Sequence, residues 1–184
     1  MNVMDITIRM IYKTDYHSVH AFQWDYLDRE SYEDFFQRVE AHPDLYLVAF
    51  YEEEMVGICY GEPTRRDPLY FCLQGIAVSL EEAKGYARKG IGSMLLNAIE
   101  EEAKRKGYHT IGLGSADDKK VERFYLKNGY HPVELVAKGS SGEELERVKI
   151  TNYDLGLITK QEMNQKYHPW EVIFIFEKNI GSYF

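Results

Sequence analysis

The spacing of apolar side chains predicts strands throughout the first half of the chain. Residues 5–13 alternate between apolar and polar positions, which is the period of a half-buried strand. The apolar runs 45–51 and 55–60 are separated by a short acidic turn and therefore predict an antiparallel hairpin. Residues 69–78 are predicted to form a further strand beside that hairpin.

A helix and an aromatic segment are expected between the first strand and the hairpin. Ser31 and Asp34 have the spacing of a helix N-cap, and apolar residues at helical intervals continue the predicted helix to residue 42. Residues 16–26 are rich in aromatic side chains, and we interpret them as a loop whose rings pack against the core.

The second half of the chain mixes helical and strand periods. Apolar residues from 91 to 103 fall on one face of a predicted helix, which Gly107 ends. Ser115 with Asp118 is expected to cap a second helix, which stops at Gly129. The remaining predicted elements are strands at 110–114, 132–137, 147–151 and 172–176, and a short helix that begins at Thr159.

This order of elements predicts an α/β fold. Antiparallel strands come first, strand–helix–strand–helix–strand follows, and one strand closes the chain, which describes a three-layer α-β-α domain with a central mixed, mostly antiparallel sheet. The 184 residues fit a single domain, 1–184, because chains of roughly 100 to 200 residues commonly fold as one unit. An excursion at about 139–170 lies between the last two strands of that sheet and opens with a Gly-Ser-Ser-Gly loop.

Composition and charge narrow the partners and the compartment. The net charge of -8, from 22 basic and 30 acidic residues, repels polyanions and argues against nucleic acid as a partner. No run of eighteen apolar residues is present and the N-terminus lacks a secretion signal, so we expect a cytoplasmic protein without a membrane partner. Cys59 and Cys72 lie in apolar runs and are interpreted as core residues, because no pattern of disulfides or metal ligands accompanies them.

A glycine-punctuated turn precedes the helix at 91–103. It reads Arg88-Lys89-Gly90-Ile91-Gly92 and follows the strand at 69–78. Residues without a Cβ let the main chain approach an anion, and a helix N-terminus adds unpaired N–H groups and the positive end of the helix dipole. The turn is therefore predicted to bind an anion such as a pyrophosphate.

Together with a second motif, this turn resembles the acyl-CoA signature of the GNAT superfamily of acyl-CoA-dependent N-acyltransferases. The string Ala87-Arg88-Lys89-Gly90-Ile91-Gly92 is similar to the family pattern Gln/Arg-x-x-Gly-x-Gly/Ala, although Ala87 replaces the usual Gln or Arg. Asp118, followed by Phe124-Tyr125-Leu126-Lys127-Asn128-Gly129-Tyr130, resembles the second signature. The two motifs occur in the expected order, and the resemblance covers about residues 45–137 and the final strand.

The resemblance implies how acetyl-CoA would be bound as the acyl donor. In such proteins the strand before the turn splays from its neighbour and offers main-chain hydrogen bonds to the pantetheine arm, while the amides of the turn hold the pyrophosphate. Backbone donors do not depend on side-chain identity, so they would act despite Ala87. The residues that the resemblance assigns to the cofactor are Ile76, Ala77, Val78, Arg88, Lys89, Gly90, Ile91, Gly92, Ser93, Asp118 and Tyr125.

The resemblance also implies a chemical step, in which a primary amine of a small molecule or peptide attacks acetyl-CoA directly in a ternary complex. Tyr125 would be the general acid that protonates the departing thiolate. A main-chain N–H within residues 75–77 would polarise the thioester carbonyl.

The general base is less well determined by the sequence. Some family members use a strand glutamate, but residues 71–74 carry no carboxylate. The base would then come from elsewhere, and Glu62 is the leading candidate, with Asp67 and Tyr70 as alternatives.

Other functions stay open at this point. A non-catalytic acyl-CoA-binding sensor is the main alternative, because Ala87 departs from the pattern and the strand carboxylate is missing. A nucleotide-binding domain would carry a Rossmann Gly-x-Gly-x-x-Gly turn and a later acidic residue, which this chain lacks in the right order. His17 and His20 are candidates to line an acceptor pocket, and the excursion at 139–170 is expected to shape that pocket or a contact in a homodimer.

Overall fold

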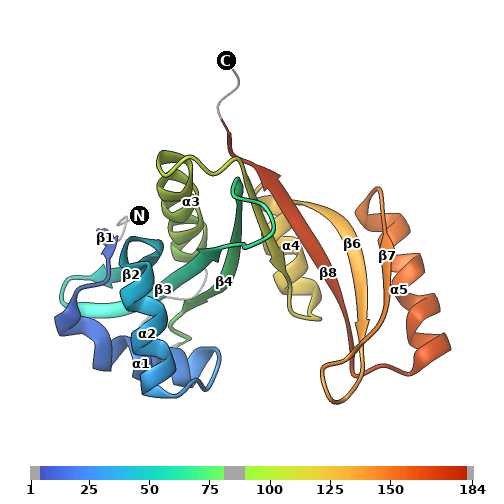
Figure 1. The fold of residues 1–184 in the computed structure, drawn as a ribbon, viewed down its shortest axis with the longest axis horizontal. Helices are drawn as coiled ribbons and strands as arrows, with labels where there is room; N and C mark the ends of the chain where they lie inside the picture. Colours follow the sequence, from blue (N-terminus) through green and yellow to red (C-terminus); the bar gives the residue numbers. More distant parts are fainter. Residues whose placement is uncertain (1–4, 81–89, 182–184) are drawn as a thin grey trace. The chain divides into compact units, whose positions relative to one another are not determined.

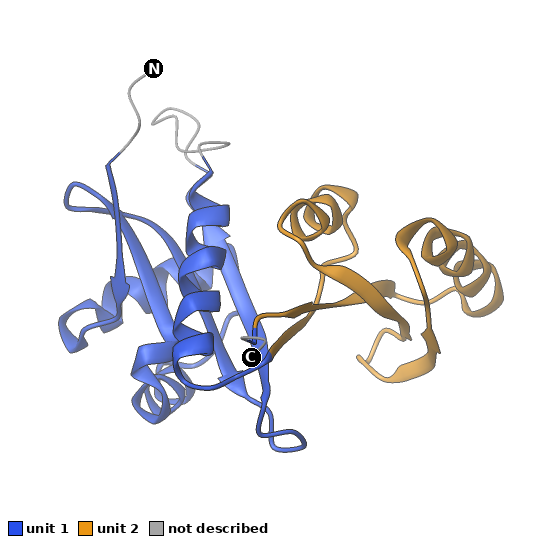
Figure 2. Ribbon diagram, turned by 90° about the horizontal axis from the view of Figure 1, so that it is seen from above, with its two compact units in different colours: residues 1–109, 181–184 blue, residues 110–180 orange. Residues whose placement is uncertain are grey.

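The structure is a computed structural model that describes residues 5–80 and 90–181. The chain divides into two compact units, one formed by residues up to 109 with the extreme C-terminus and one formed by residues 110–180 (Figure 2). Both units contain helices as well as strands, which confirms the α/β class (Figure 1).

The described residues of the first unit form four antiparallel strands, in which each strand pairs with the next along the chain. The predicted hairpin and the strand beside it are confirmed, since their three strands pair in sequence order. The four strands are β1 (Ile6–Met10), β2 (Tyr46–Tyr51), β3 (Glu54–Pro63) and β4 (Tyr70–Val78).

The helices of the first unit pack on the sheet of that unit from both faces. Tyr46, Val48, Ile58 and Tyr60 point to one face, where they form a core with buried residues of the first two helices. A Cβ at Gly57 would come within 2.8 Å of Leu95, so the alternate positions face the third helix. These helices are α1 (Tyr16–Tyr26), α2 (Tyr32–Ala41) and α3 (Ile91–Arg105), and two 3₁₀ turns, η1 (Lys13–Asp15) and η2 (Pro43–Leu45), join them to the strands.

In this unit the predicted cap of α2 is confirmed, whereas the predicted conformation of residues 16–26 is wrong. Ser31 caps α2, because its hydroxyl accepts a hydrogen bond from the Asp34 amide at 3.1 Å. The interpretation of residues 16–26 as a loop is wrong, since they form α1. The helical period is hard to see in the sequence because one of its three buried positions is polar, namely Gln23.

The strands of the second unit pair in the order β5-β8-β6-β7, and each of these pairings is antiparallel. Helix α5 of this unit packs on β6 and β8. The elements are β5 (Thr110–Gly114), α4 (Lys119–Lys127), β6 (His131–Lys138), β7 (Glu144–Lys149), α5 (Tyr153–Tyr167) and β8 (Glu171–Asn179).

Two helix starts in this unit differ from the prediction. α5 begins six residues before Thr159, because the side chain of Asn152 accepts a hydrogen bond from the Leu155 amide and forms the N-cap. Asp118, and not Ser115, caps α4, since its carboxylate accepts a hydrogen bond from the Lys120 amide at 2.7 Å. The predicted cap Thr159 therefore lies inside α5, whereas the predicted Ser115 lies three residues before the true cap of α4.

The pairings described within each unit are all antiparallel, which agrees with the predicted mostly antiparallel character. The single domain and the splay between neighbouring strands stay predictions. In the described ranges, every helix is too short or too polar to span a bilayer.

Candidate functional site

The N-terminus of α3 has the backbone expected of an anion site. Gly90 is its N-cap residue and adopts the left-handed conformation at φ 79°, which a glycine tolerates without strain. Within the described part of the chain, no side chain caps this end and no acceptor bonds the amides from Gly90 to Ser93. The other predicted members of the turn, Arg88 and Lys89, lie outside the described residues.

Main-chain groups of β4 alternate between two directions. The Ser79 amide donates to the Val56 carbonyl at 2.8 Å, and the antiparallel ladder repeats every second residue. The N–H of Ala77 is therefore directed at β3, whereas the N–H groups of Ile76 and Val78 point away from it. Ile76 and Val78 thus have the orientation that a main-chain donor to a ligand needs, and Ala77 does not.

A β-bulge interrupts β4 just before this segment. Tyr60 of β3 pairs with Gly75, but the next residue, Gly61, pairs with Leu73. Gln74 is therefore an extra residue in β4 without a cross-strand partner on β3. Bulges redirect side chains and bend strands, so β4 changes its local geometry directly next to Gly75.

Glu62, the predicted base, lies inside β3 and not after it. It pairs with Cys72, and its side chain is exposed. Because directly opposite residues of two paired strands share a face, the Glu62 and Cys72 side chains lie on the same face of the sheet. Burial raises the pKa of the Cys72 thiol, and the Glu62 charge adds to that rise. Glu62 is two residues from Tyr60 on the same strand, which places both side chains on that face about 7 Å apart along it.

The alternative bases have less favourable surroundings. A carboxylate oxygen of Asp67 accepts a hydrogen bond from the Leu69 amide at 2.9 Å and so shapes the turn between β3 and β4. Tyr70 is the first residue of β4. Glu62 is therefore the one candidate of the three that combines a carboxylate with a position inside a strand.

The two histidines of α1 hold α1 against α2. The His17 ring stacks on Tyr32 with 4.6 Å between the ring centroids, and a ring nitrogen of His20 lies 2.8 Å from the Glu30 carbonyl oxygen. These contacts give both residues a packing role. Their predicted place in an acceptor pocket stays a prediction.

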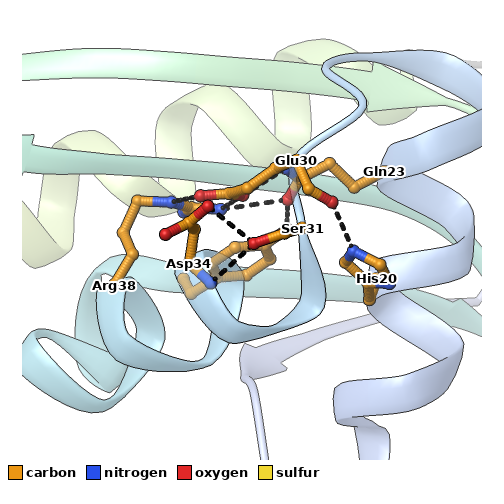
Figure 3. A network of polar contacts seen from close by, with 7 residues as sticks. His20, Gln23, Glu30, Ser31, Asp34 and Arg38 are labelled. Carbon is orange, nitrogen blue, oxygen red and sulfur yellow. Dashed lines mark hydrogen bonds and ion pairs between the residues drawn. The ribbon is translucent and has the colours of Figure 1, made fainter.

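A buried polar network, which we call the Gln23 network, joins α1, α2 and β2 (Figure 3). The Gln23 side chain, 1% exposed, donates to Glu30 at 2.8 Å and accepts from the Tyr46 hydroxyl at 2.8 Å. Arg38 donates to both carboxylate oxygens of Glu30 at 3.1 and 2.5 Å and to Gln23 at 3.2 Å. Burial alone would raise the pKa of Glu30, but the bonds from Arg38 and Gln23 outweigh it and lower that pKa.

Tyr60 lies beside this network and was not singled out from the sequence. Its ring stacks on Tyr46 with 4.7 Å between centroids, and the Arg38 guanidinium lies 4.3 Å from the Tyr60 centroid. Burial raises the pKa of Tyr60 to about 12; the Arg38 charge opposes the rise, and the Asp28 and Glu30 charges add to it. The only signal in the sequence is the alternation along β3, which does not distinguish Tyr60 from the other residues on the same face of the strand.

In the second unit, the predicted catalytic motif forms the end of a helix. Gly129, at φ 86°, donates its N–H to the Leu126 carbonyl, and the Tyr130 N–H donates to the Tyr125 carbonyl at 3.1 Å. This is a Schellman motif, whose usual apolar contact is made here by the rings of Tyr125 and Tyr130 at 5.8 Å. Tyr125 is 6% exposed and also packs on Phe176. The motif spacing therefore has a structural cause in addition to any chemical one.

A second polar cluster, the Lys160 cluster, lies between α4, α5 and β8 of the same unit. The Lys160 ammonium lies 2.6 Å from Asp117 and 2.8 Å from Glu122, whose side chain is fully buried. The Tyr153 hydroxyl donates to the other Glu122 oxygen at 2.5 Å, and the second oxygen of Asp117 accepts from the Val172 amide. Burial by itself lowers the pKa of Lys160, but the two carboxylates outweigh it and raise that pKa.

Comparison with known proteins gives one family and many similar folds. Residues 8–130 match the Acetyltransferase (GNAT) family. No curated protein sequence matches the chain.

Three solved structures illustrate the similarity of fold. Ard1 from Thermoplasma volcanium has a TM-score of 0.67 and 16% identity, over 95% of this chain and 97% of that one. The yncA protein from Salmonella typhimurium, solved with its cofactor acetyl-CoA, has a TM-score of 0.68 and 15% identity, over 98% and 96%. Naa50 of Arabidopsis thaliana, solved with the bisubstrate analogue CoA-Ac-MVNAL, has a TM-score of 0.64 and 14% identity, over 95% and 98%. At these identities the likeness shows the fold alone.

Proposed function

Because its residues 8–130 match the family, this chain belongs to the GNAT acetyltransferase family, and on that premise we propose that it is an acetyl-CoA-dependent N-acetyltransferase. Its acceptor is a primary amine of a small molecule or a peptide. The observation that carries the proposal is the uncapped N-terminus of α3, where Gly90 leaves a set of amides able to bind a diphosphate. The solved complexes of yncA with acetyl-CoA and of Naa50 with a CoA analogue support the choice of donor.

The reaction needs an uncharged amine, stabilisation of the oxyanion and a proton for the leaving thiolate. We assign the diphosphate to the amides of Gly90, Ile91, Gly92 and Ser93, and the oxyanion to the N–H of Ile76, which points away from β3. The amine nitrogen attacks the thioester carbonyl carbon, and the C–S bond then breaks.

Two side chains would move protons in this reaction. Glu62, exposed on β3, would accept a proton from the amine, directly or through water. Tyr125 would give its phenol proton to the coenzyme A thiolate, which requires its hydroxyl to lie within hydrogen-bond distance of the sulfur. Asp118 serves as the N-cap of α4, and its expected contact with the cofactor stays a prediction.

The function is tested by incubating the protein with acetyl-CoA and a panel of amines, and by following the release of coenzyme A thiol. The panel contains a polyamine, an aminoglycoside, amino acid esters and peptides with free N-termini. Tyr125→Phe is expected to lower kcat at least about tenfold, while the dissociation constant of coenzyme A is unchanged. Tyr153→Phe is the matched control, because it removes a hydroxyl of the same unit that bonds only within the Lys160 cluster.

The result also separates the competing functions. Binding of acetyl-CoA without turnover of any amine would favour a sensor. Calorimetry with coenzyme A, NAD and ATP covers the nucleotide-binding alternative, since tighter binding of NAD or ATP than of coenzyme A would contradict the proposed donor. Full activity of Tyr125→Phe would remove this residue from the mechanism without removing the reaction.

A further inference from the structure

The hydroxyl of Tyr60 is a polar group that the fold of the first unit leaves unused. The residue is 3% exposed, yet its hydroxyl forms no hydrogen bond with any residue in the ranges 5–80 and 90–181. Every fully enclosed side-chain oxygen or nitrogen of the described residues does have such a partner. The Tyr60 hydroxyl must therefore reach solvent at the end of a ring that is otherwise enclosed.

The surrounding residues hold this ring in one orientation. One face stacks on Tyr46 with an interplanar angle of 6°, and the Arg38 guanidinium packs on the ring at 4.3 Å. Arg38 is in turn fixed by two bonds to Glu30. A side chain that is locked by its neighbours presents its polar end with little loss of conformational entropy when a ligand binds.

The ring has room because the facing residue of β4, Gly75, is a glycine. A Cβ at Gly75 would lie 2.7 Å from Cε1 and 2.8 Å from Cζ of Tyr60, and 3.0 Å from Leu27. The hydroxyl-bearing end of Tyr60 therefore occupies the place that a side chain at position 75 would take. This place adjoins the bulge and is one residue from Ile76, the proposed oxyanion donor.

The charges around the hydroxyl suit a cation. Asp28 lies in the loop between α1 and α2, is exposed, and forms no ion pair or hydrogen bond with any residue that the structure describes. Burial is the main cause that raises the pKa of Tyr60 to about 12, and the charges of Asp28 and Glu30 add to this rise. A phenol with that pKa stays protonated at neutral pH, so it is not a base, but its oxygen still accepts hydrogen bonds. Arg38 does not repel a cation strongly, because Glu30 already neutralises it.

We propose that Tyr60 and Asp28 bind the acceptor amine of the acetyltransfer reaction. The amine N–H donates a hydrogen bond to the Tyr60 oxygen, and the Asp28 carboxylate attracts the substrate as an ammonium ion. The assignment rests on the proposed function and adds to it the side chains that select a cationic primary amine. An oxyanion is the alternative ligand for this hydroxyl, but the carboxylates nearby disfavour it.

The test is the Tyr60→Phe variant, assayed with the best amine of the panel and with acetyl-CoA at saturation. The KM for the amine is expected to rise about tenfold, because the variant loses one hydrogen bond to the amine. The kcat and the KM for acetyl-CoA are expected to change less than about twofold. Asp28→Asn is expected to raise the KM for the amine about threefold and to weaken its dependence on salt. Tyr16→Phe is the matched control, because its hydroxyl donates to Glu40 and its amine KM should equal that of the wild type.

The possible outcomes differ in what they overturn. An unchanged amine KM in Tyr60→Phe overturns the assignment, and so does a lower kcat at unchanged amine KM, which would indicate an oxyanion contact. If the wild type acetylates no amine of the panel, the proposed function itself fails and this assignment fails with it. A tenfold effect in Tyr60→Phe together with wild-type behaviour of Tyr16→Phe supports the assignment.

Discussion

Each unit of this protein encloses a polar network, and the two networks differ in what they leave over. In the Lys160 cluster, Glu122 is fully buried and both of its oxygens are bonded, one by Lys160 and one by the Tyr153 hydroxyl. The polar groups of the Gln23 network are also hydrogen-bonded, but Tyr60, which stacks on Tyr46 of that network, has a hydroxyl that reaches solvent. A network whose polar groups are all bonded stabilises the fold, whereas a hydroxyl that reaches solvent and has no protein partner is available to a ligand.

The electrostatics follow the same division. Lys160 lies between two carboxylates, Asp117 and Glu122, which leaves the cluster one net negative charge, but the oxygens of both carboxylates are already bonded by Lys160, the Tyr153 hydroxyl and the Val172 amide. Near Tyr60, Arg38 is matched by Glu30, and Asp28 remains as an exposed carboxylate without a described partner. The first unit therefore carries one negative charge and one neutral hydroxyl in the place where a cationic amine is proposed to bind.

The largest expected effect is on the closed cluster. Lys160→Met should lower the free energy of unfolding by about 3–5 kcal/mol, because it leaves the fully buried Glu122 without its counter-charge. Urea unfolding measures this loss. Lys166→Met is the control, since that side chain is 61% exposed and its ammonium lies 3.8 Å from a Glu146 oxygen, so its loss should leave the free energy of unfolding nearly unchanged. A loss below about 1 kcal/mol in Lys160→Met would show that the cluster is not as tightly closed as described.

A smaller effect compares the two stacked tyrosines directly. Tyr46→Phe should cost about 1 kcal/mol, because it removes the hydrogen bond to Gln23 at 2.8 Å in a buried site. Tyr60→Phe should change the free energy of unfolding by less than about 0.5 kcal/mol, since its hydroxyl has no protein partner to lose. Thermal unfolding of both variants measures the difference. Equal losses in the two would mean that the Tyr60 hydroxyl has a structural partner after all.

The smallest expected effect is the response of the Gln23 network to acid. The folded-state pKa of Glu30 is depressed, so its contribution to stability is present above the ordinary glutamate pKa of about 4.3 and is lost as the pH falls through the lower folded value. Stability measured between pH 6 and pH 3 should therefore fall less steeply in Glu30→Gln than in the wild type. Parallel profiles would contradict the lowered pKa. Lys160 acts with the opposite sign, because its raised pKa confines the loss of its contribution to strongly alkaline pH.

Local signals account for the elements that were predicted well. Ser31 caps α2 as its spacing indicates, and Gly107 and Gly129, both at positive φ, end α3 and α4. These features depend on hydrogen bonds within a few residues, so the sequence carries them almost completely. Helix α1 is not predicted because its stability comes from a buried face, which includes Val19, that no short pattern reveals. The start of α5 does have a local signal, the Asn152 cap, which the prediction passed over in favour of Thr159.

The sequence by itself determined the α/β class, the glycine at the start of α3 and the motif that contains Tyr125, because each is a property of neighbouring residues. Only the tertiary structure decided which strand residues matter. Tyr60 became a candidate because β3 and β4 pair in a register that sets it opposite Gly75, and because Arg38 of α2 packs on its ring. The spacing of 15 residues between Tyr60 and Gly75 has no meaning until the bulge at Gln74 fixes the pairing, and cross-strand neighbours of this kind follow from the fold and not from local order.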